Sequence, residues 1–272
     1  MSVAPADAHD GGMNAVLAAP STLDPSVSPP TPLASARDLT RIWGRGHAAQ
    51  IGVSGVDLDI GRGELVAVIG PSGSGKSTLG ALIAGVDRPT SGSLVVDGVR
   101  IDSMKPDRLA QWRGDNVGIV FQDFHLLPTL TASENVELAL QLGGSGLGRR
   151  QRRRAARDAL GSVGLADMAR KLPAQMSGGE QQRVGIARAI VTEPRLIVAD
   201  EPTGSLDQAN GRAVFELLVE VSRRGTTVVF ITHDLSLCLL YTSDAADDEY
   251  NVWVGGGGGG GLGGGGGGGG GG

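Results

Sequence analysis

Short runs of apolar residues, each followed by polar or glycine-rich sequence, mark the strands of this chain. Four runs have the length of strands and lie at 65–69, 117–121, 196–199 and 227–231. Because they are apolar almost throughout, they are typical of strands buried on both faces of a parallel sheet. Helix-like stretches separate them, so the pattern predicts an α/β fold.

Two other segments have a different periodicity. From Ile51 to Ile60 apolar positions roughly alternate with polar ones, which predicts a half-buried strand ahead of the first apolar run. Between residues 124 and 176 strand signals vanish and the periodicity becomes helical. We interpret 124–176 as an inserted α-helical subdomain.

The two ends of the chain differ in composition from the middle. Residues 1–33 are rich in Ala, Pro, Ser and Asp and lack the basic start of a signal peptide, so we expect a disordered tail. A start codon assigned too early, with Met13 or a later codon as the true start, is the alternative. The whole chain carries a net charge of −5, but residues 34–237 hold all 24 Lys and Arg and 22 of the 29 Asp and Glu. One domain over 34–237, with a net charge of +2, is the preferred reading.

The segment 238–272 does not read as a natural protein end. Residues 238–247 can be encoded by TGT CTC TTA TAC ACA TCT GAC GCT GCC GAC, which matches a transposase adapter used in tagmentation sequencing. Residues 255–272 are all Gly except Leu262, and GGG encodes Gly, so this stretch reads as a run of G base calls. A genuine flexible Gly-rich linker is the alternative.

Cysteine, histidine and hydropathy narrow the function classes. The only cysteine, Cys238, excludes an intramolecular disulfide framework and a Cys-based metal cluster, and the four histidines are scattered. Nowhere does an apolar run approach the roughly 18–20 residues of a membrane span. We therefore expect a chain that is soluble, or peripheral to a membrane.

A phosphate-binding loop follows the first apolar run. The segment satisfies G-x-x-x-x-G-K-[ST] and consists of Gly70, Pro71, Ser72, Gly73, Ser74, Gly75, Lys76 and Ser77, with a helix-compatible stretch from Thr78. Its backbone N–H groups can surround a polyphosphate, Lys76 can reach the β- and γ-phosphates, and the Ser77 hydroxyl can bind Mg²⁺. A purely structural glycine-rich turn is a poor alternative in this strand–loop–helix context.

A pair of carboxylates ends the third apolar run. Asp200 and Glu201 follow 196–199, at the edge where open α/β sheets bind ligands. Side chains alternate along a strand, so the two cannot do the same work. Asp200 is expected to hold Mg²⁺ and Glu201 to act as general base on the attacking water. A solvated pair at a strand end is the structural alternative for this motif alone.

Further motifs resemble those of ATP-binding cassette ATPases and occur in that family's order across about 38–236. Met176 to Arg183 resembles the family's signature motif, with Met where Leu is usual. The remaining matches are Gln122 as the Q-loop glutamine, Ser205 to Asp207 as the D-loop, His233 as the switch histidine, and Trp43 in place of the usual adenine-stacking Tyr.

The resemblance implies a P-loop NTPase with a mostly parallel core, an N-terminal antiparallel β part and the inserted helical subdomain. It also implies Mg²⁺ and ATP, with Gln122 as a further metal ligand and His233 as donor to the γ-phosphate. The cradle of Ser177, Gly178, Gly179 and Glu180, with Asp207, is expected to cap the nucleotide of a second copy. Taken alone, His233 and Gln122 read as a structural and a surface residue, and Trp43 as packing.

Within the family, the sequences around Gln122, Ser177 and Asp200 look most like the lipoprotein-releasing and macrolide-exporter branch. That branch implies an ATPase that is peripheral on the cytoplasmic face of the membrane and powers a separate permease, and it favours export over import. We expect the permease to contact Gln122 to Pro128 and the helical subdomain. A cassette acting as a regulatory clamp on a membrane partner is the alternative, and a DNA or ribosome cassette is the rival class.

A run of arginines remains outside these motifs. It comprises Arg149, Arg150, Arg152, Arg153, Arg154 and Arg157. No aromatic residues interleave with it, so we expect no nucleic-acid partner. We interpret it as a solvated helix face near anionic lipid headgroups.

Overall fold

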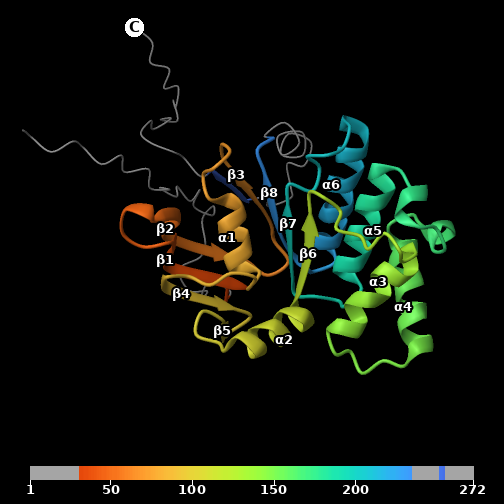
Figure 1. Cartoon of the computed structure of the whole chain (residues 1–272), viewed down its shortest axis with the longest axis horizontal. Helices are drawn as coiled ribbons and strands as arrows, with labels where there is room; N and C mark the ends of the chain where they lie inside the picture. The colour runs from red at the N-terminus through yellow and green to blue at the C-terminus, as the bar shows by residue number, and fades with distance from the viewer. Residues whose placement is uncertain (1–30, 235–250, 255–272) are drawn as a thin grey trace, which may run out of the picture.

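The structure, a computed structural model, describes residues 31–234 and 251–254, and within these ranges five parallel strands form the central sheet in the order β6-β7-β8-β3-β9 (Figure 1). The strands are β3 (Leu65–Ile69), β6 (Val117–Phe121), β7 (Leu196–Asp200), β8 (Thr227–Thr232) and β9 (Asn251–Val254). The predicted α/β class with a parallel core is confirmed.

Both faces of this sheet are buried, which explains the unbroken apolar runs. Along β3, Val66 and Val68 pack into one hydrophobic cluster with α1 (Lys76–Ile83) and the antiparallel strands. Ala67 and Ile69 point into a second cluster on the opposite face. There they join residues of α5 (Gly178–Ile190) and α6 (Gln208–Arg223). Because successive side chains of a strand alternate between faces, each position meets an apolar neighbour.

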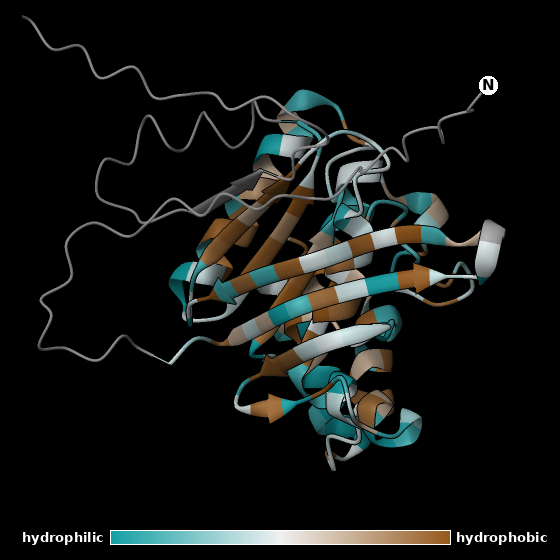
Figure 2. Cartoon of the chain, turned by 90° about the vertical axis from the view of Figure 1, so that its left-hand side faces the viewer, coloured by the Kyte–Doolittle hydropathy of each residue, from teal (hydrophilic) through white to brown (hydrophobic). Residues whose placement is uncertain are grey.

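A separate antiparallel sheet packs beside α1, with the strand order β2-β1-β4-β5. Its strands are β1 (Ala34–Trp43), β2 (Gln50–Ile60), β4 (Ser91–Val96) and β5 (Val99–Arg100), with the short 3₁₀ helix η1 (Gly46–Ala48) between β1 and β2. Figure 2 shows hydrophobic and hydrophilic bands along these strands, as expected of a sheet with one face on the core. The predicted antiparallel β part is therefore present.

A layer of helices lies at the β6 edge of the sheet (Figure 1). After α2 (Pro106–Asn116) and β6, the chain forms α3 (Ala132–Leu142), α4 (Arg149–Ser162), η2 (Ala166–Met168), η3 (Pro173–Gln175) and α5 before it returns as β7. Capping boxes begin two of these helices: Thr131 with Glu134 at α3, and Ser177 with Glu180 at α5. The inserted helical segment predicted from the sequence is seen here, with α5 packed against α3 and α4.

The two terminal segments fall mostly outside the described residues. Of 1–33, only 31–33 are described, and Leu33 is buried in the first cluster with its N–H donating to the Ile60 carbonyl at 2.7 Å. Of 238–272, only β9 is described, and its backbone lies parallel to β3. The adapter interpretation of 238–272 stays a prediction. Searched over the described ranges, no helix is long and apolar enough to span a bilayer.

Candidate functional site

Three neighbouring strands deliver polar residues to the same edge of the parallel sheet. Gln122 follows β6, Asp200 ends β7 with Glu201 directly after it, and His233 follows β8. In the sheet register, Phe121 pairs with Asp200, and Asp200 with Ile231. The strands therefore end level with one another, and their next residues meet at the carboxyl edge.

The phosphate-binding loop joins this edge from β3, which pairs with β8 through Ile69 and Thr232. Gly73 and Gly75 have φ of 81° and 89°, a left-handed conformation that favours glycine. Lys76 is only 6% exposed, and its Nζ donates to the carbonyls of Gly70 at 2.8 Å and Pro71 at 2.9 Å. The loop thus curls around its own lysine.

Ser77 and Asp200 meet across the site. The Ser77 Oγ donates to Asp200 Oδ1 at 3.0 Å, joining the start of α1 to the end of β7. Burial, above all, raises the pKa of Asp200; the hydrogen bond from Ser77 opposes this, and the charge of Glu201 adds to it. A divalent cation beside Asp200 would offset the cost of burying its charge.

Glu201 has an unusual backbone and a defined partner. Its φ is 48°, in the left-handed region that few non-glycine residues adopt. Its N–H donates to the Ile231 carbonyl at 2.9 Å, and its Oε2 lies 2.8 Å from the Nδ1 of His233. Neighbouring strand ends therefore hold the Glu201 carboxylate in place. A strained backbone held by its surroundings in this way is typical of functional sites.

A cavity of about 540 Å³ opens over the loop and these strand ends. Its lining comprises Trp43, Ile51, Gly52, Ser72, Gly73, Gly75, Lys76, Ser77, Thr78, Gln122, Glu201 and His233. The predicted phosphate, base and switch residues are thus brought together with Trp43. The glycine at position 52 leaves space for the indole, because a Cβ there would lie 2.5 Å from the Trp43 ring.

Sequence reasoning missed the residues that hold Trp43. The Arg41 guanidinium carbon lies 5.6 Å from the centre of the indole, within range of a cation–π contact. The Asp87 carboxylate fixes the Arg41 guanidinium through two contacts of 2.8 Å, one from Nε and one from Nη2. Trp43 is 38% exposed and lines the cavity, whereas Arg41 does not. Arg41 lies two residues before Trp43 on β1, but the register is irregular between Arg41 and Ile42, so no regular strand period marked the contact. Nothing in the sequence pointed to Asp87.

Gly204 was also missed as a neighbour of Gln122. A Cβ at position 204 would lie 3.0 Å from the Gln122 Nε2, so the side-chain amide packs directly against this turn. The turn follows Glu201, whose carbonyl accepts from the Gly204 N–H at 3.0 Å. Gln122 and Glu201 are therefore coupled through one glycine.

The signature residues lie elsewhere. Ser177 caps α5 and accepts from the Glu180 N–H at 3.3 Å, while the Glu180 carboxylate accepts from the Ser177 N–H at 2.7 Å, which lowers the pKa of Glu180. Asp207 caps α6, accepting from the Asn210 N–H at 2.9 Å. Neither the signature residues 177–180 nor Asp207 lines the cavity over the phosphate-binding loop. One chain does not assemble all the predicted nucleotide contacts.

Two features fit Mg²⁺ and a nucleoside triphosphate. The Ser74 Oγ is buried without a hydrogen-bond partner inside the loop, where a phosphate oxygen could accept from it. The hydroxyl of Ser77 and the carboxylate of Asp200 are oxygen ligands of the type that Mg²⁺ prefers. No group of three or more His, Cys, Asp or Glu suited to a metal occurs in the described part of the chain. So few protein ligands are consistent with Mg²⁺, because this ion fills most of its coordination shell with waters and phosphate oxygens.

Comparisons with known proteins agree with this geometry. Residues 53–204 match the ABC transporter family. The chain is 50% identical over 179 residues to the ABC transporter ATP-binding protein YknY of Bacillus subtilis, covering 66% of this chain and 77% of that protein. It is 44% identical over 203 residues to the macrolide export ATP-binding/permease protein MacB of Wolinella succinogenes, covering 75% of this chain but only 31% of MacB.

A solved structure has the same fold. It is the dimeric post-hydrolysis state of the ATP-binding cassette MJ0796 bound to ADP and Pi, with 39% sequence identity and a TM-score of 0.69. The similarity covers 75% of this chain and 89% of the MJ0796 chain.

Proposed function

The chain belongs to the ABC transporter family as an ATP-binding, ATP-hydrolysing cassette, and we propose that it powers a separate membrane permease of the exporter type. The observation that carries this proposal is the convergence of Lys76, Ser77 and Glu201 on one cavity at the carboxyl edge of the sheet, with Asp200 hydrogen-bonded to Ser77 beside it. The export assignment rests on the similarity to MacB, and this similarity covers about a third of the length of MacB.

The catalytic roles follow from the contacts at that edge. When bound, Mg²⁺ neutralises phosphate charge, and Ser77, Asp200 and Gln122 would hold it. Lys76 exchanges its loop carbonyls for the β- and γ-phosphates, because a buried ammonium favours an anionic partner. Glu201 accepts the proton of the attacking water. In the nucleotide-free chain the Nδ1 of His233 orients this carboxylate, and with nucleotide bound His233 donates its hydrogen bond to the γ-phosphate instead.

The complete site requires two copies of the chain. Ser177, Gly178 and Gly179 open α5, where backbone N–H groups and the helix dipole favour an anion. They do not line their own chain's cavity, so we assign them to the nucleotide held by a second copy. A head-to-tail homodimer thereby forms two equivalent sites, and the dimeric state of MJ0796 supports this arrangement.

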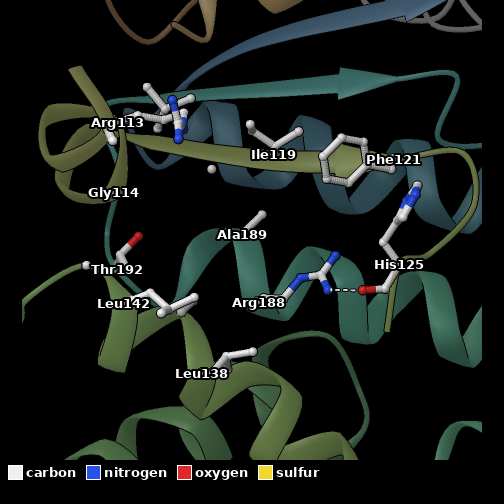
Figure 3. A pocket seen from close by; sticks show the side chains of 15 residues that line it. Arg113, Gly114, Ile119, Phe121, His125, Leu138, Leu142, Arg188, Ala189 and Thr192 are labelled. Carbon is white, nitrogen blue, oxygen red and sulfur yellow. Dashed lines mark hydrogen bonds between the residues drawn. The ribbon is translucent and has the colours of Figure 1, made fainter. Parts of the chain in front are cut away.

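A second cavity suits the permease. The groove, of about 460 Å³, lies between α2 and β6 on one side and α3 and α5 on the other (Figure 3). Phe121 and Leu142 line it and are 37% and 79% exposed. Exposed apolar side chains along a groove are typical of a protein-binding site. We assign this groove to a cytoplasmic segment of the permease, which would hold the chain at the inner face of the membrane.

Arg188 connects this groove to both halves of the nucleotide site. It donates to the carbonyl of His125 at 2.6 Å (Figure 3) and to the carbonyl of Phe124 at 2.9 Å, three and two residues after Gln122. Arg188 lies on α5, the helix that begins at the signature residues. A shift of Gln122 on hydrolysis can therefore reach the groove and α5 together through one guanidinium.

Cross-linking tests the assignment of the groove. With Cys238 replaced by Ser, we expect a cysteine at His125 or Thr129 to cross-link to the permease encoded beside this gene in the complete transporter. Ser103, exposed near β5, is the matched control position. Adducts at Ser103 but not at His125 or Thr129 would place the permease on the antiparallel sheet and overturn the assignment.

A further inference from the structure

The arginines at the start of α4 form a basic surface that the nucleotide site does not use. We define the arginine face as Arg149, Arg150, Arg153, Arg154 and Arg157, all of which are exposed. Four of them follow the spacing i, i+3, i+4, i+7 from Arg150, which places them on one side of the helix. The opposite side carries Ala156, Ala159 and Leu160, which are buried. The charge is therefore gathered on the solvent side of a helix anchored in the core.

Most of this charge is not neutralised within the described part of the chain. The buried carboxylate of Glu137 is within 3.6 Å of Arg152 and 3.9 Å of Arg153, which holds α4 against α3. Arg154 lies 3.8 Å from Asp158, but both side chains are more than 70% exposed, so the pair contributes little. For Arg149, Arg150 and Arg157 no ion pair is found among the described residues.

The placement of these arginines opposes the stability of the helix. The first turn of α4 contains no acidic residue, although the helix dipole there favours negative charge. Arg149 and Arg150 occupy this turn, and Arg153 and Arg154 follow four residues later, so like charges repel along one face. An anionic surface opposite the arginine face would relieve this repulsion.

The arginine face also adjoins the groove assigned to the permease. Leu138, Ala139 and Leu142 of α3 line that groove, and Glu137, which contacts Arg152 and Arg153, is the residue before Leu138. Figure 1 shows the loop from α3 to α4 at the lower end of the helical layer, level with α2. Arg149 lies six positions after Gly143, which lines the groove, so the two are at most about 20 Å apart along an extended chain. A permease seated in the groove brings the surface of its membrane close to this helix start.

We propose that the arginine face binds the anionic phospholipid headgroups around the permease. This inference rests on the proposed function, because the membrane is brought near by the permease. Guanidinium groups pair bidentately with phosphate oxygens, and a basic cluster near a membrane is attracted to anionic lipid. Neither α4 nor the preceding loop contains an aromatic residue for base stacking, which favours lipid over nucleic acid.

Sedimentation of the full chain with vesicles tests the proposal. We expect binding to vesicles of equal parts phosphatidylglycerol and phosphatidylcholine, little binding to phosphatidylcholine alone, and weaker binding at high salt. Replacing Arg149, Arg150 and Arg157 together with Gln should lower the partition coefficient at least about 10-fold, since each arginine near an anionic surface contributes on the order of 5-fold. The control replaces Arg62, Arg212 and Arg224, which removes the same charge elsewhere and should leave the partition coefficient near the wild-type value.

Equal binding to both kinds of vesicle, or equal loss in the two triple variants, would overturn the inference. So would capture of duplex DNA that depends on the arginine face while vesicle binding does not. ATP hydrolysis by the Arg149, Arg150, Arg157 variant should be unchanged, and its thermal stability should not fall, because the substitutions relieve repulsion in α4. If the triple variant loses vesicle binding but still hydrolyses ATP, the effect belongs to the arginine face alone. If the wild type hydrolyses no ATP, the proposed function itself is wrong.

Discussion

The Nδ1 of His233 lies 2.8 Å from the Oε2 of Glu201, so the end of β8 fixes the carboxylate that follows β7. The contact joins two residues that are 32 positions apart in the sequence. It gives the proposed base a defined orientation toward the cavity that both residues line.

Replacing the base should separate hydrolysis from binding. We expect Glu201→Gln to lower kcat by about 10²- to 10⁴-fold, as for the loss of a general base, while the affinity for ATP changes little. Gln is close in size to Glu and can still contact His233. Steady-state hydrolysis and equilibrium ATP binding measure the two effects, with Lys76→Ala as the comparison that should lose binding. A Glu201→Gln protein that hydrolyses ATP at the wild-type rate would remove Glu201 from this role.

The contact between Arg41 and Trp43 should govern recognition of the adenine ring of ATP rather than of its phosphates. We expect Trp43→Ala to weaken ATP binding about 10-fold through lost stacking, and Arg41→Gln to weaken it about 2- to 5-fold through lost support of the indole. Asp87→Asn should resemble Arg41→Gln, because Asp87 holds the guanidinium.

Tripolyphosphate, which lacks a base, separates this role from general attraction of anions. Its affinity should be unchanged in all three variants. If Arg41→Gln weakened the binding of tripolyphosphate and of ATP equally, Arg41 would act through its charge on the phosphates. Its assignment to recognition of the adenine ring would then be wrong.

The start of α3 should respond to pH through Glu134. Its carboxylate accepts from the backbone N–H and hydroxyl of Thr131, and the backbone bond above all lowers the pKa of Glu134. A lowered folded-state pKa stabilises the protein above the unfolded value of about 4.3, and this contribution disappears as pH falls through the folded value.

Glu134→Gln keeps a capping group but removes the charge. The wild type should exceed this variant in unfolding free energy by a few tenths of a kcal/mol at neutral pH, since the site is exposed. The difference should vanish in acid. Urea titrations over a pH series measure it, and a constant difference at every pH would show that the charge of Glu134 plays no part.

Much of the fold could be predicted because burial on both faces leaves a simple pattern. The runs at 65–69 and 117–121 are the strands β3 and β6 as predicted, and the runs at 196–199 and 227–231 fall one residue short of β7 and β8. β1 was not predicted as a strand, because irregularities in its register between Ala36 and Ile42 break the alternation that marks a half-buried strand.

Site residues were predictable where a motif fixes the chemistry, and not where only packing does. Lys76 and Ser77 sit in a loop whose spacing is distinctive, so their neighbourhood with Asp200 could be expected. Arg41, Gly204 and Arg188 act through contacts with Trp43, Gln122 and the His125 carbonyl. Those contacts join segments far apart in sequence or lie at a bulge, and no local pattern encodes them.

The central claim, that each ATP site is shared between two copies, is tested most directly by mixing two inactive variants. Lys76→Ala disables the loop, and Gly178→Asp places a carboxylate where the second copy's phosphates would lie. Position 178 suits this change because a Cβ there has its nearest neighbours at 3.5 and 3.6 Å, whereas at Gly179 it would lie 2.4 Å from Asn210.

Each variant alone should hydrolyse almost no ATP. In a mixed head-to-tail dimer one site combines both defects and the other has none, so equal amounts should restore about a quarter of the wild-type sites. ATP hydrolysis measured across a series of mixing ratios should therefore rise to a maximum near equal amounts. A mixture no more active than its separate components at every ratio would contradict a site built from two copies.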